Sequence, residues 1–391
     1  MNHSVPFHPA DILLPVHPTD RYPVVACDQY TSEPNYWEQV ERIVGDAPST
    51  LRLTLPEIYL KEEDLPERIE AVNASMERYL SEGVLKEYPD AMILVERRLA
   101  DGRCRMGLIG AVDLDAYDHT PGTRAMIRAT EGTVLERIPP RVAVRKGACI
   151  ELPHVMLLLD DPEKTVIEPL IGNGEQIYDL TLMQGGGSVK GWLLDDEAKE
   201  RVLSALGALC EGEDPMLFAV GDGNHSLATA KACAALSPSP LASRALVEVV
   251  NLHDPALDFE PIYRVLFGVN AEEVFAAAEA FFDGGEGKEI TLLAGNRRMT
   301  VKAEGLICEK VQAFLDSYLA THPEGEVDYI HGEEVVERLS TEEGTVGFLF
   351  PGIAKSELFP YVKAQGALPR KTFSMGHAHD KRYYLEGRRI R

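Results

Sequence analysis

The chain has 391 residues, of which 45% are hydrophobic and 26% charged, so it can bury a full core and is long enough for two or three domains. Its 63 acidic residues outnumber 39 Lys and Arg, and the resulting net charge of -24 repels nucleic acid and anionic membrane surfaces. We therefore expect neither nucleic acid nor a membrane as a partner.

The start of the sequence, MNHSVPFHPADILLPVHPTD, has no basic segment followed by a continuous apolar run, and no stretch approaches the roughly 20 apolar residues that span a bilayer. These features predict a cytoplasmic protein. The six cysteines are scattered without a C-x-x-C pair, which argues against a zinc knuckle, a redox dithiol or a disulfide framework. The oligomeric state is not indicated by the sequence.

The first elements form a predicted N-terminal lobe over residues 1–150. The segment YPVVACDQY predicts a short strand, and TSEPNYWEQVERIVGD predicts a helix capped by Thr31 or Ser32 and ended by Gly45. RIEAVNASMERYLSEGVL predicts a second helix. AMILVERRLADGRCRMGLIGAVDL predicts a hairpin that turns at Asp101 and Gly102.

A central lobe is predicted over residues 151–265. HVMLLLDDPEKTVIEPL is expected to form a strand, a turn and a helix, and DEAKERVLSALGALC an amphipathic helix. Residues 216–252 then predict a strand, a glycine loop, a helix and a strand, an order that permits a crossover unit with the loop at the carboxyl end of its strand.

A C-terminal lobe is predicted over residues 266–391. The helix AEEVFAAAEAFF precedes the hairpin ITLLAGNRRMTVKA, the helix KVQAFLDSYLA and the strand GTVGFLF, and a basic tail follows. This mixture of helices and strands predicts a mixed α+β or α/β fold.

The segment GDGNHS contains the strongest candidate site. Gly221 and Gly223 permit unusual backbone angles, and Asn224 or Ser226 can cap the helix that follows. A glycine-preceded helix N-terminus suits a phosphate or carboxylate, so Asp222 is a candidate Mg²⁺ ligand and His225 a candidate donor to a phosphate oxygen. The spacing is not that of a Walker loop, and a capped turn without a ligand explains it equally well.

Two basic clusters stand out in this acidic chain as candidate phosphate-binding groups. TRAMIRATEGTVLERIPPRVAVRK supplies Arg128 and Arg141, and the C-terminal PRKTFS supplies Arg370 and Lys371. The alternative is that these residues are solvated or ion-paired surface charges. The same tail contains His377 and His379, which form a weak candidate metal site.

A glycine-rich loop and two acidic residues are further candidates. The glycines of QGGGSVKGW and its Lys190 form either a lid hinge or, more simply, a connector. Asp28 and Glu33 lie at a strand-to-helix junction, where a carboxylate can orient or deprotonate an acceptor hydroxyl. Glu33 also has a structural explanation, because an acidic residue stabilises a helix N-terminus.

Two resemblances sharpen these candidates. DGNHS followed by LATAKA resembles the DGHHR signature of free serine kinases with a ParB/sulfiredoxin-like fold. The present chain departs from that signature at two positions: Asn224 stands where the signature has a histidine, and Ser226 stands where it has an arginine. More widely, ACDQYTSEPNYW, LRLTLPEIYL, RMGLIGAVDLDAYD, IRATEGTVLERIPPR and LPRKTFSMGHAHDKRYYLEGRRI resemble the uncharacterised bacterial family catalogued as domain of unknown function 1015. Together the two resemblances imply a ParB/sulfiredoxin-like core elaborated with further mixed-sheet lobes.

The sequence therefore predicts a phosphotransferase that moves phosphate from ATP, ADP or pyrophosphate, with Mg²⁺, to the hydroxyl of a small anionic metabolite such as free L-serine. The alternative is a protein that binds a nucleotide or small anion without catalysis, which the absence of an arginine at Ser226 favours. A metal-dependent hydrolase using His225, His377 and His379 is a second alternative.

Overall fold

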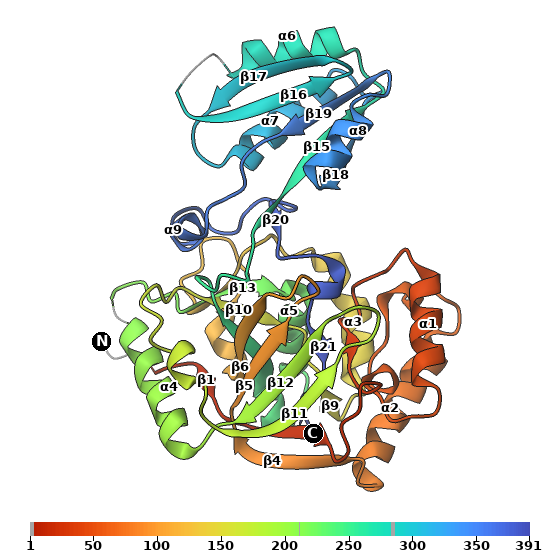
Figure 1. Cartoon of the computed structure of the whole chain (residues 1–391), viewed down its shortest axis with the longest axis vertical. Coiled ribbons are helices and arrows are strands. Elements are labelled where there is room, and N and C mark those ends of the chain that lie inside the picture. Colours follow the sequence, from red (N-terminus) through yellow and green to blue (C-terminus); the bar gives the residue numbers. More distant parts are fainter. Residues whose placement is uncertain (1–3, 211, 283–285) are drawn as a thin grey trace. The chain divides into compact units, whose positions relative to one another are not determined.

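The computed structural model describes residues 4–210, 212–282 and 286–391, which form two compact units (Figure 1). The first unit combines residues 1–257 with 361–367 and 377–391, and the second combines 258–360 with 368–376. The three expected lobes differ from this division because strands from the first two of them share one sheet, and because the chain returns to the first unit at its end.

A ten-stranded mixed sheet forms the centre of the first unit. In spatial order its strands are β11 (Glu175–Thr181), β12 (Ser188–Leu193), β5 (Ile93–Arg98), β6 (Cys104–Asp113), β14 (Arg244–Asn251), β10 (Met156–Leu159), β13 (Phe218–Asp222), β8 (Ile127–Ala129) and β7 (Tyr117–Asp118), with β1 (Phe7–His8) pairing with β6. The predicted hairpin at Gly102 is confirmed as the antiparallel pair β5 and β6. Both parallel and antiparallel pairs occur, so the predicted mixed α+β class is confirmed.

Hydrophobic cores lie on both faces of this sheet. One core buries the apolar sides of α4 (Asp196–Leu209) and α5 (Asn224–Ala234). The other receives α1 (Pro34–Val44) and α2 (Leu65–Ser81), which follow the apolar spacing expected from the sequence. A further helix of this unit, α3 (Ile138–Lys146), packs against α5.

Two small sheets bring distant parts of the first unit together. One has the order β4 (Leu85–Ala91), β2 (Ala10–Pro15), β22 (Gly387–Arg389) and β9 (Ile150–Glu151). The other pairs β21 (Tyr383–Tyr384) with β3 (Val24–Val25). The basic tail predicted from the sequence is therefore largely an interior segment of this unit, joined to its first strands.

Some local predictions differ from the structure. Helix α1 begins after Glu33, and neither Thr31 nor Ser32 caps it, whereas Gly45 ends it as expected. Residues 168–170 form only a 3₁₀ turn instead of a helix. Strand β10 lies between β13 and β14, antiparallel to one and parallel to the other, so residues 216–252 are not a parallel crossover unit.

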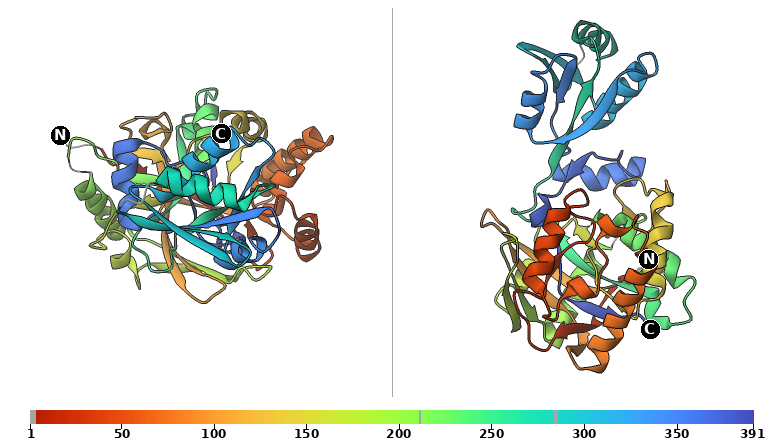
Figure 2. Two further views of the ribbon diagram at one scale, coloured as in Figure 1. Left: turned by 90° about the horizontal axis from the view of Figure 1, so that it is seen from above. Right: turned by 90° about the vertical axis from the view of Figure 1, so that its right-hand side faces the viewer.

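The second unit has a six-stranded sheet between helices, as the views in Figure 2 show. Its strands are β17 (Arg297–Ala303), β16 (Lys288–Ala294), β19 (Thr345–Leu349), β15 (Glu260–Phe267) and β18 (Glu326–His331), with β20 (Phe373–Ser374) pairing with β15. Helices α6 (Ala271–Phe282) and α7 (Ile307–Leu319) pack on one face and α8 (Glu333–Leu339) on the other. Helix α9 (Lys355–Gln365) contributes residues to both units.

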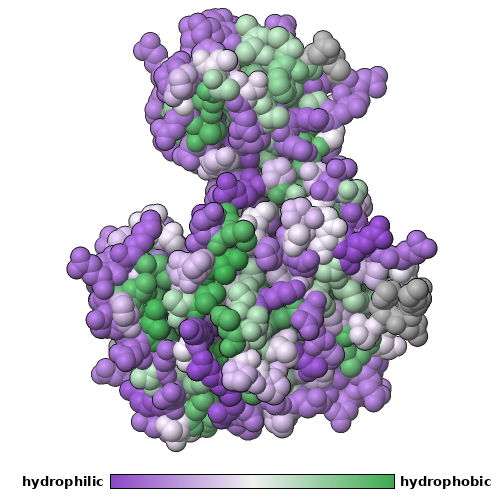
Figure 3. Space-filling model, turned by 180° about the vertical axis from the view of Figure 1, so that it is seen from behind, coloured by the Kyte–Doolittle hydropathy of each residue, from purple (hydrophilic) through white to green (hydrophobic). Residues whose placement is uncertain are grey.

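On the face shown in Figure 3, hydrophilic residues cover much of the surface and hydrophobic residues form patches among them. Within the described residues, no helix is both long and apolar enough to cross a bilayer.

Candidate functional site

The GDGNHS loop turns sharply from the end of β13 into α5. Gly223 has a φ of +84°, and a Cβ atom there would lie 3.0 Å from the Cα of Val155. Residues other than glycine rarely adopt this conformation, and a side chain here would require the backbone at Val155 to shift. The prediction of an unusual backbone angle is therefore confirmed at Gly223, whereas Gly221 has no positive φ. Helix α5 begins directly after Gly223, at Asn224, and no side chain caps it, so the predicted cap by Asn224 or Ser226 is wrong.

Asp222 lies at the carboxyl end of β13 and contacts a lysine from the end of the chain. Its Oδ1 accepts a hydrogen bond from the Gly223 amide at 2.9 Å, and its Oδ2 lies 3.2 Å from the Nζ of Lys381. The Lys381 side chain is only 15% exposed, so solvent screens this pair less than it screens a surface ion pair. The loop thus has a cation beside it that the sequence analysis did not single out.

Asp28 lies close enough to Lys381 for the lysine charge to affect its pKa. Burial raises the pKa of Asp28, but the charges of His154 and Lys381 and a hydrogen bond from Gln29 outweigh burial, and the net pKa lies below the usual value. Asp28 therefore stays ionised at neutral pH. The predicted candidates Asp28 and Asp222 are brought together through their shared neighbour, Lys381.

A hydrogen-bonded chain connects α5 to the first strands of the unit. Ser226 Oγ lies 3.2 Å from Nε2 of buried His154, and His154 Nδ1 lies 2.7 Å from the hydroxyl oxygen of Tyr384. The Tyr384 hydroxyl donates to the sulfur of Cys27 at 3.1 Å. Burial keeps this phenol neutral by raising its pKa well above the ordinary value. Ser226 is thus held by a histidine, and His154 is a site residue that the sequence analysis missed.

Arg141 pairs with Glu57, a neighbour of Asp28 and another residue that sequence reasoning missed. The two side chains form an ion pair and are 18% and 16% exposed. Burial raises the pKa of Glu57, and the charge of Asp28 raises it further, against the opposite effect of Arg141. Asp28 and Glu57 are therefore neighbouring carboxylates whose pKa values are moved in opposite directions, a pattern typical of acid and base pairs in active sites.

His225 connects α5 to the loop after β8. Its Nε2 accepts a hydrogen bond from the Val134 amide at 3.1 Å, so this nitrogen carries no proton to donate. The adjacent Asn224 has a buried Oδ1 without a hydrogen-bond partner among the described residues. His225 as a donor to phosphate, and Asn224 and Gly221 as parts of the loop, stay predictions.

Other sequence candidates have different surroundings. Arg128 is 3% exposed, donates to the Ala125 carbonyl and pairs with Asp214, which gives it a structural role. Glu33 is exposed at the start of α1. Arg370 and Lys371 belong to the second unit, and their role in phosphate binding stays a prediction.

Metal binding was predicted at Asp222 and, as an alternative, at His377 and His379. The two histidine rings stack with centroids 5.4 Å apart. Over the described part of the chain, no three His, Cys, Asp or Glu side chains are gathered as metal ligands. Mg²⁺ commonly binds through one or two carboxylates and substrate phosphates, so Asp222 stays a predicted ligand.

Buried ion pairs hold the C-terminal segment under this site. Arg382 pairs with Glu248 and with Glu386, all three side chains being at most 5% exposed. Burying such charges is costly unless each is paired and hydrogen-bonded. The neighbouring Lys381 is therefore placed by a firmly anchored backbone.

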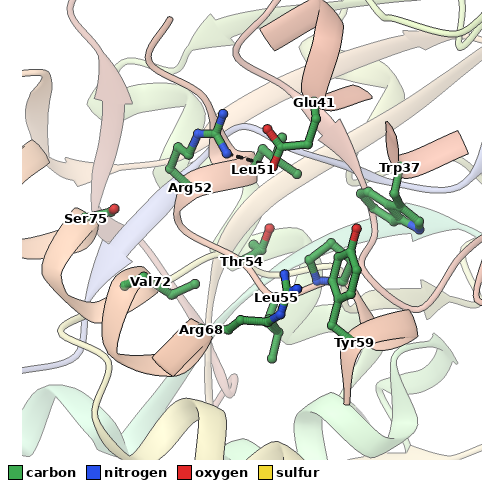
Figure 4. A pocket seen from close by; sticks show the side chains of 12 residues that line it. Trp37, Glu41, Leu51, Arg52, Thr54, Leu55, Tyr59, Arg68, Val72 and Ser75 are labelled. Carbon is green, nitrogen blue, oxygen red and sulfur yellow. Dashed lines mark hydrogen bonds and ion pairs between the residues drawn. The ribbon is translucent and has the colours of Figure 1, made fainter. Parts of the chain in front are cut away.

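Two cavities lie elsewhere in the first unit. One, of about 160 Å³, is lined by Trp37, Tyr59 and Arg68, and the guanidinium of Arg68 lies 4.2 Å from the centre of the Tyr59 ring (Figure 4). A larger cavity of about 510 Å³ is lined by Arg145, Cys233 and other residues near the end of α5. Neither is lined by Asp28, Asp222 or Lys381.

The fold and site together define a mixed α+β protein in which Asp28, with a lowered pKa, and Glu57, with a raised pKa, lie near a helix that begins after a glycine. Its sequence matches the family described as a protein of unknown function, DUF1015, over residues 12–341. The chain therefore belongs to this family, as the sequence motifs indicated. No curated protein matches it.

Several solved structures share part of the fold. A free serine kinase variant in complex with AMP is 14% identical, with 70% of the present chain and 90% of the kinase chain covered and a TM-score of 0.41. SbnI with a C-terminal truncation, from Staphylococcus aureus, is 12% identical, with 68% and 82% covered and a TM-score of 0.38. A conserved hypothetical protein from Pyrococcus furiosus is 14% identical, with 70% and 90% covered and a TM-score of 0.35. At these values the likeness assigns no substrate or reaction to the present chain.

Proposed function

We propose that the protein is a phosphotransferase that moves phosphate from a nucleotide or pyrophosphate to the hydroxyl of a small metabolite. The observation that carries the proposal is the arrangement of Asp28, Asp222 and Lys381 around the start of α5. It combines the positive end of a helix, a partly buried cation and a carboxylate kept ionised, three features that phosphoryl transfer requires.

Each group has a part in the proposed reaction. The backbone N–H groups after Gly223 and the ammonium of Lys381 bind the anionic phosphate. Asp28 orients the acceptor hydroxyl and accepts its proton, which it can do because its lowered pKa leaves it ionised at neutral pH. Glu57, with its raised pKa, is the neighbouring group suited to hold a proton.

Mg²⁺ would be held by Asp222 and would neutralise charge between the phosphates when bound. The identity of the phosphate donor remains part of the proposal, and ATP, ADP and pyrophosphate are the candidates.

The test is phosphate transfer by the purified full-length protein, followed by ³¹P NMR with each donor, with and without Mg²⁺, over a panel of small hydroxyl compounds. We expect Asp28→Asn to lower kcat/KM about 10²- to 10⁴-fold, because removing a general base has effects of this size. Asp222→Asn should also lower turnover. Asp179→Asn is the matched control, since Asp179 is at an exposed position of β11 and lies 3.0 Å from Lys190.

The outcomes separate the proposed functions. The absence of transfer with every donor and acceptor would end the phosphotransferase proposal. Nucleotide binding without turnover would favour the alternative of a non-catalytic binding protein. The contact between Ser226 and His154 supports this alternative, because Ser226 stands where the kinase signature has an arginine.

A further inference from the structure

The cavity of about 510 Å³ in the first unit lies at the other end of α5 from Gly223. Cavities of this volume are typical of small-molecule sites, whereas well-packed interiors contain few voids larger than a water molecule. Ala230 and Ala234, one turn apart on α5, line the cavity with small side chains, and residues 236–239 of the following loop line it further. The cavity therefore has the size of a ligand site.

Two basic segments of the sequence meet at this cavity. Arg145 and Lys146 end α3, and Arg391 belongs to the C-terminal tail. The guanidinium of Arg391 donates to the main-chain carbonyl of Lys146, which joins the two segments. No Asp or Glu among the described residues lines the cavity, although acidic residues outnumber basic ones by 63 to 39 in the whole chain. The lining side chains therefore carry a local excess of positive charge.

The buried carboxylate nearest to this cluster does not cancel its charge. Arg145 lies 2.5 Å from Oε2 of Glu151, and Arg388 lies 2.7 Å from Oε1 of the same residue. Burial raises the pKa of Glu151, but the charges of the two arginines outweigh burial, and the net pKa is below the ordinary value. One carboxylate thus serves two guanidiniums. Within the described part of the chain, Lys146 and Arg391 have no ion pair of their own.

Two serine hydroxyls add hydrogen-bond donors to the lining. The Ser237 hydroxyl accepts from the amide of Ser239 at 3.2 Å, and the Ser239 hydroxyl accepts from the amide of Leu241 at 3.3 Å. A hydroxyl has one proton to donate, and neither proton has an acceptor among the described residues. Both serines can therefore donate to an anion in the cavity.

The remaining lining is mainly apolar. Ala148 and Ile390 are each 5% exposed, and Leu236 is 69% exposed beside the cavity. A ligand with an apolar body would remove the exposed part of Leu236 from water, which is favourable. A ligand that satisfies the whole lining therefore has both an anionic and an apolar part.

The lining also argues against two other kinds of anion. No aromatic side chain among the described residues lines the cavity, so a nucleotide base finds no ring on which to stack. Inorganic phosphate would leave the apolar part of the lining unused and would lose hydration beside it. The carboxyl end of α3 favours cations such as Arg145 and Lys146 by its dipole, but this does not explain the open cavity or Arg391.

We propose that this cavity binds a small amphipathic anion, with a single carboxylate on an aliphatic chain. The carboxylate accepts from Lys146, Arg391 and the serine hydroxyls, and the chain packs along Ala230, Ala234 and Leu236. The inference is independent of the proposed function, because the cavity is lined by none of the residues assigned to phosphate transfer.

The first test is calorimetric titration of the full chain with linear carboxylates from butyrate to decanoate. We expect binding that tightens by up to about fourfold for each methylene that is buried. The alcohol and the alkylammonium with the same chain as octanoate should bind roughly tenfold more weakly or worse, because neither accepts charge-assisted hydrogen bonds from the cations. The inference is overturned if no carboxylate binds, or if the alcohol or the ammonium binds as tightly as octanoate.

Two pairs of variants locate the site. Ala234→Phe fills the cavity and should abolish octanoate binding, whereas Ala232→Phe, on the same helix but outside the lining, should leave it unchanged. Lys146→Gln should weaken octanoate binding by about threefold or more, because it removes a charged donor. Arg389→Gln is its control, since Arg389 pairs with Glu87 and does not line the cavity.

Circular dichroism and cooperative unfolding verify that each variant folds. If Ala234→Phe does not fold, Lys146→Gln decides the assignment, because Lys146 is exposed. Octanoate binding that is equal in the folded lining variants and the native protein would overturn the inference.

Competition identifies the kind of anion that the cavity takes. ATP and inorganic phosphate should not displace octanoate. If ATP displaces it, the cavity takes a nucleotide and the assignment to an aliphatic carboxylate is overturned. Binding of inorganic phosphate or acetate as tightly as octanoate would show a simple anion site and would also overturn the assignment.

Discussion

Glu57 makes the first unit sensitive to pH in a defined direction. Its pKa in the folded protein is raised from the ordinary 4.5, so the folded state binds the proton more tightly than the unfolded chain does. The stability that Glu57 contributes is therefore complete below about pH 4.5 and declines as pH rises through the folded pKa. Each unit of pKa difference corresponds to about 1.4 kcal/mol.

The prediction concerns the difference in free energy of unfolding between the native protein and Glu57→Gln, from urea titrations between pH 4 and 8. We expect the difference to fall with rising pH and then become constant. In the background of Arg141→Gln the decline should extend to higher pH, because Arg141 holds the pKa of Glu57 down. A difference that increases with pH would contradict the assignment.

The site residues show what a sequence can predict at this scale. Asp222 and Gly223 were found because a glycine loop before a helix is a local pattern. Lys381 and Glu57 had no local signal, since their importance comes from residues distant in the chain, such as Asp222 for Lys381 and Arg141 for Glu57. Arg128 was selected for its charge, and only its burial against Asp214 reveals a structural partner.

At the scale of elements, the sharp turn before α5 depends on the absence of a side chain at Gly223. We predict that Gly223→Ala lowers the free energy of unfolding by more than Gly122→Ala. Both glycines have positive φ, at +84° and +77°, which costs alanine about 1–2 kcal/mol, but only Gly223 has backbone within 3.0 Å of the added Cβ.

The measurement is urea unfolding of both variants together with phosphate transfer. Gly122→Ala isolates the cost of the backbone angle because its Cβ meets nothing within 4 Å. Equal losses of stability in the two variants would show that the approach of Val155 does not constrain the loop.

Elements were predictable where periodicity and turn residues agree. Helices α1, α2 and α4 and the hairpins at Gly102 and Gly295 follow directly from local pattern. The order of strands was not predictable, because the placement of β10 between β13 and β14 depends on packing of distant segments rather than on spacing. The basic tail illustrates the same limit, since its charges are opposed by Glu151, Glu248 and Glu386 from within the fold.

At the scale of the whole molecule, a net charge of -24 repels an anionic substrate, so local cations must overcome the overall field. One of these cations, Lys381, comes from the last residues of the chain, which return to the first unit. Strand β22 lies between β2 and β9, so the beginning, middle and end of the chain meet in one sheet. Arg388 on β22 is 5% exposed and lies 2.7 Å from buried Glu151.

The buried pair of Arg388 and Glu151 predicts that substitutions at Arg388 and at the adjacent Arg389 have very different effects on the free energy of unfolding. Arg388→Met should lower the free energy of unfolding by about 3–5 kcal/mol, because it leaves part of the buried Glu151 charge uncompensated. Arg389→Met should cost less than about 1 kcal/mol, because Arg389 pairs with Glu87 at a half-exposed position. Hydrogen exchange should show lost protection in β2 and β9 for the first variant, with β15 and β16 of the second unit unchanged. Similar losses in both variants would mean that the end of the chain does not close the first unit through this buried pair.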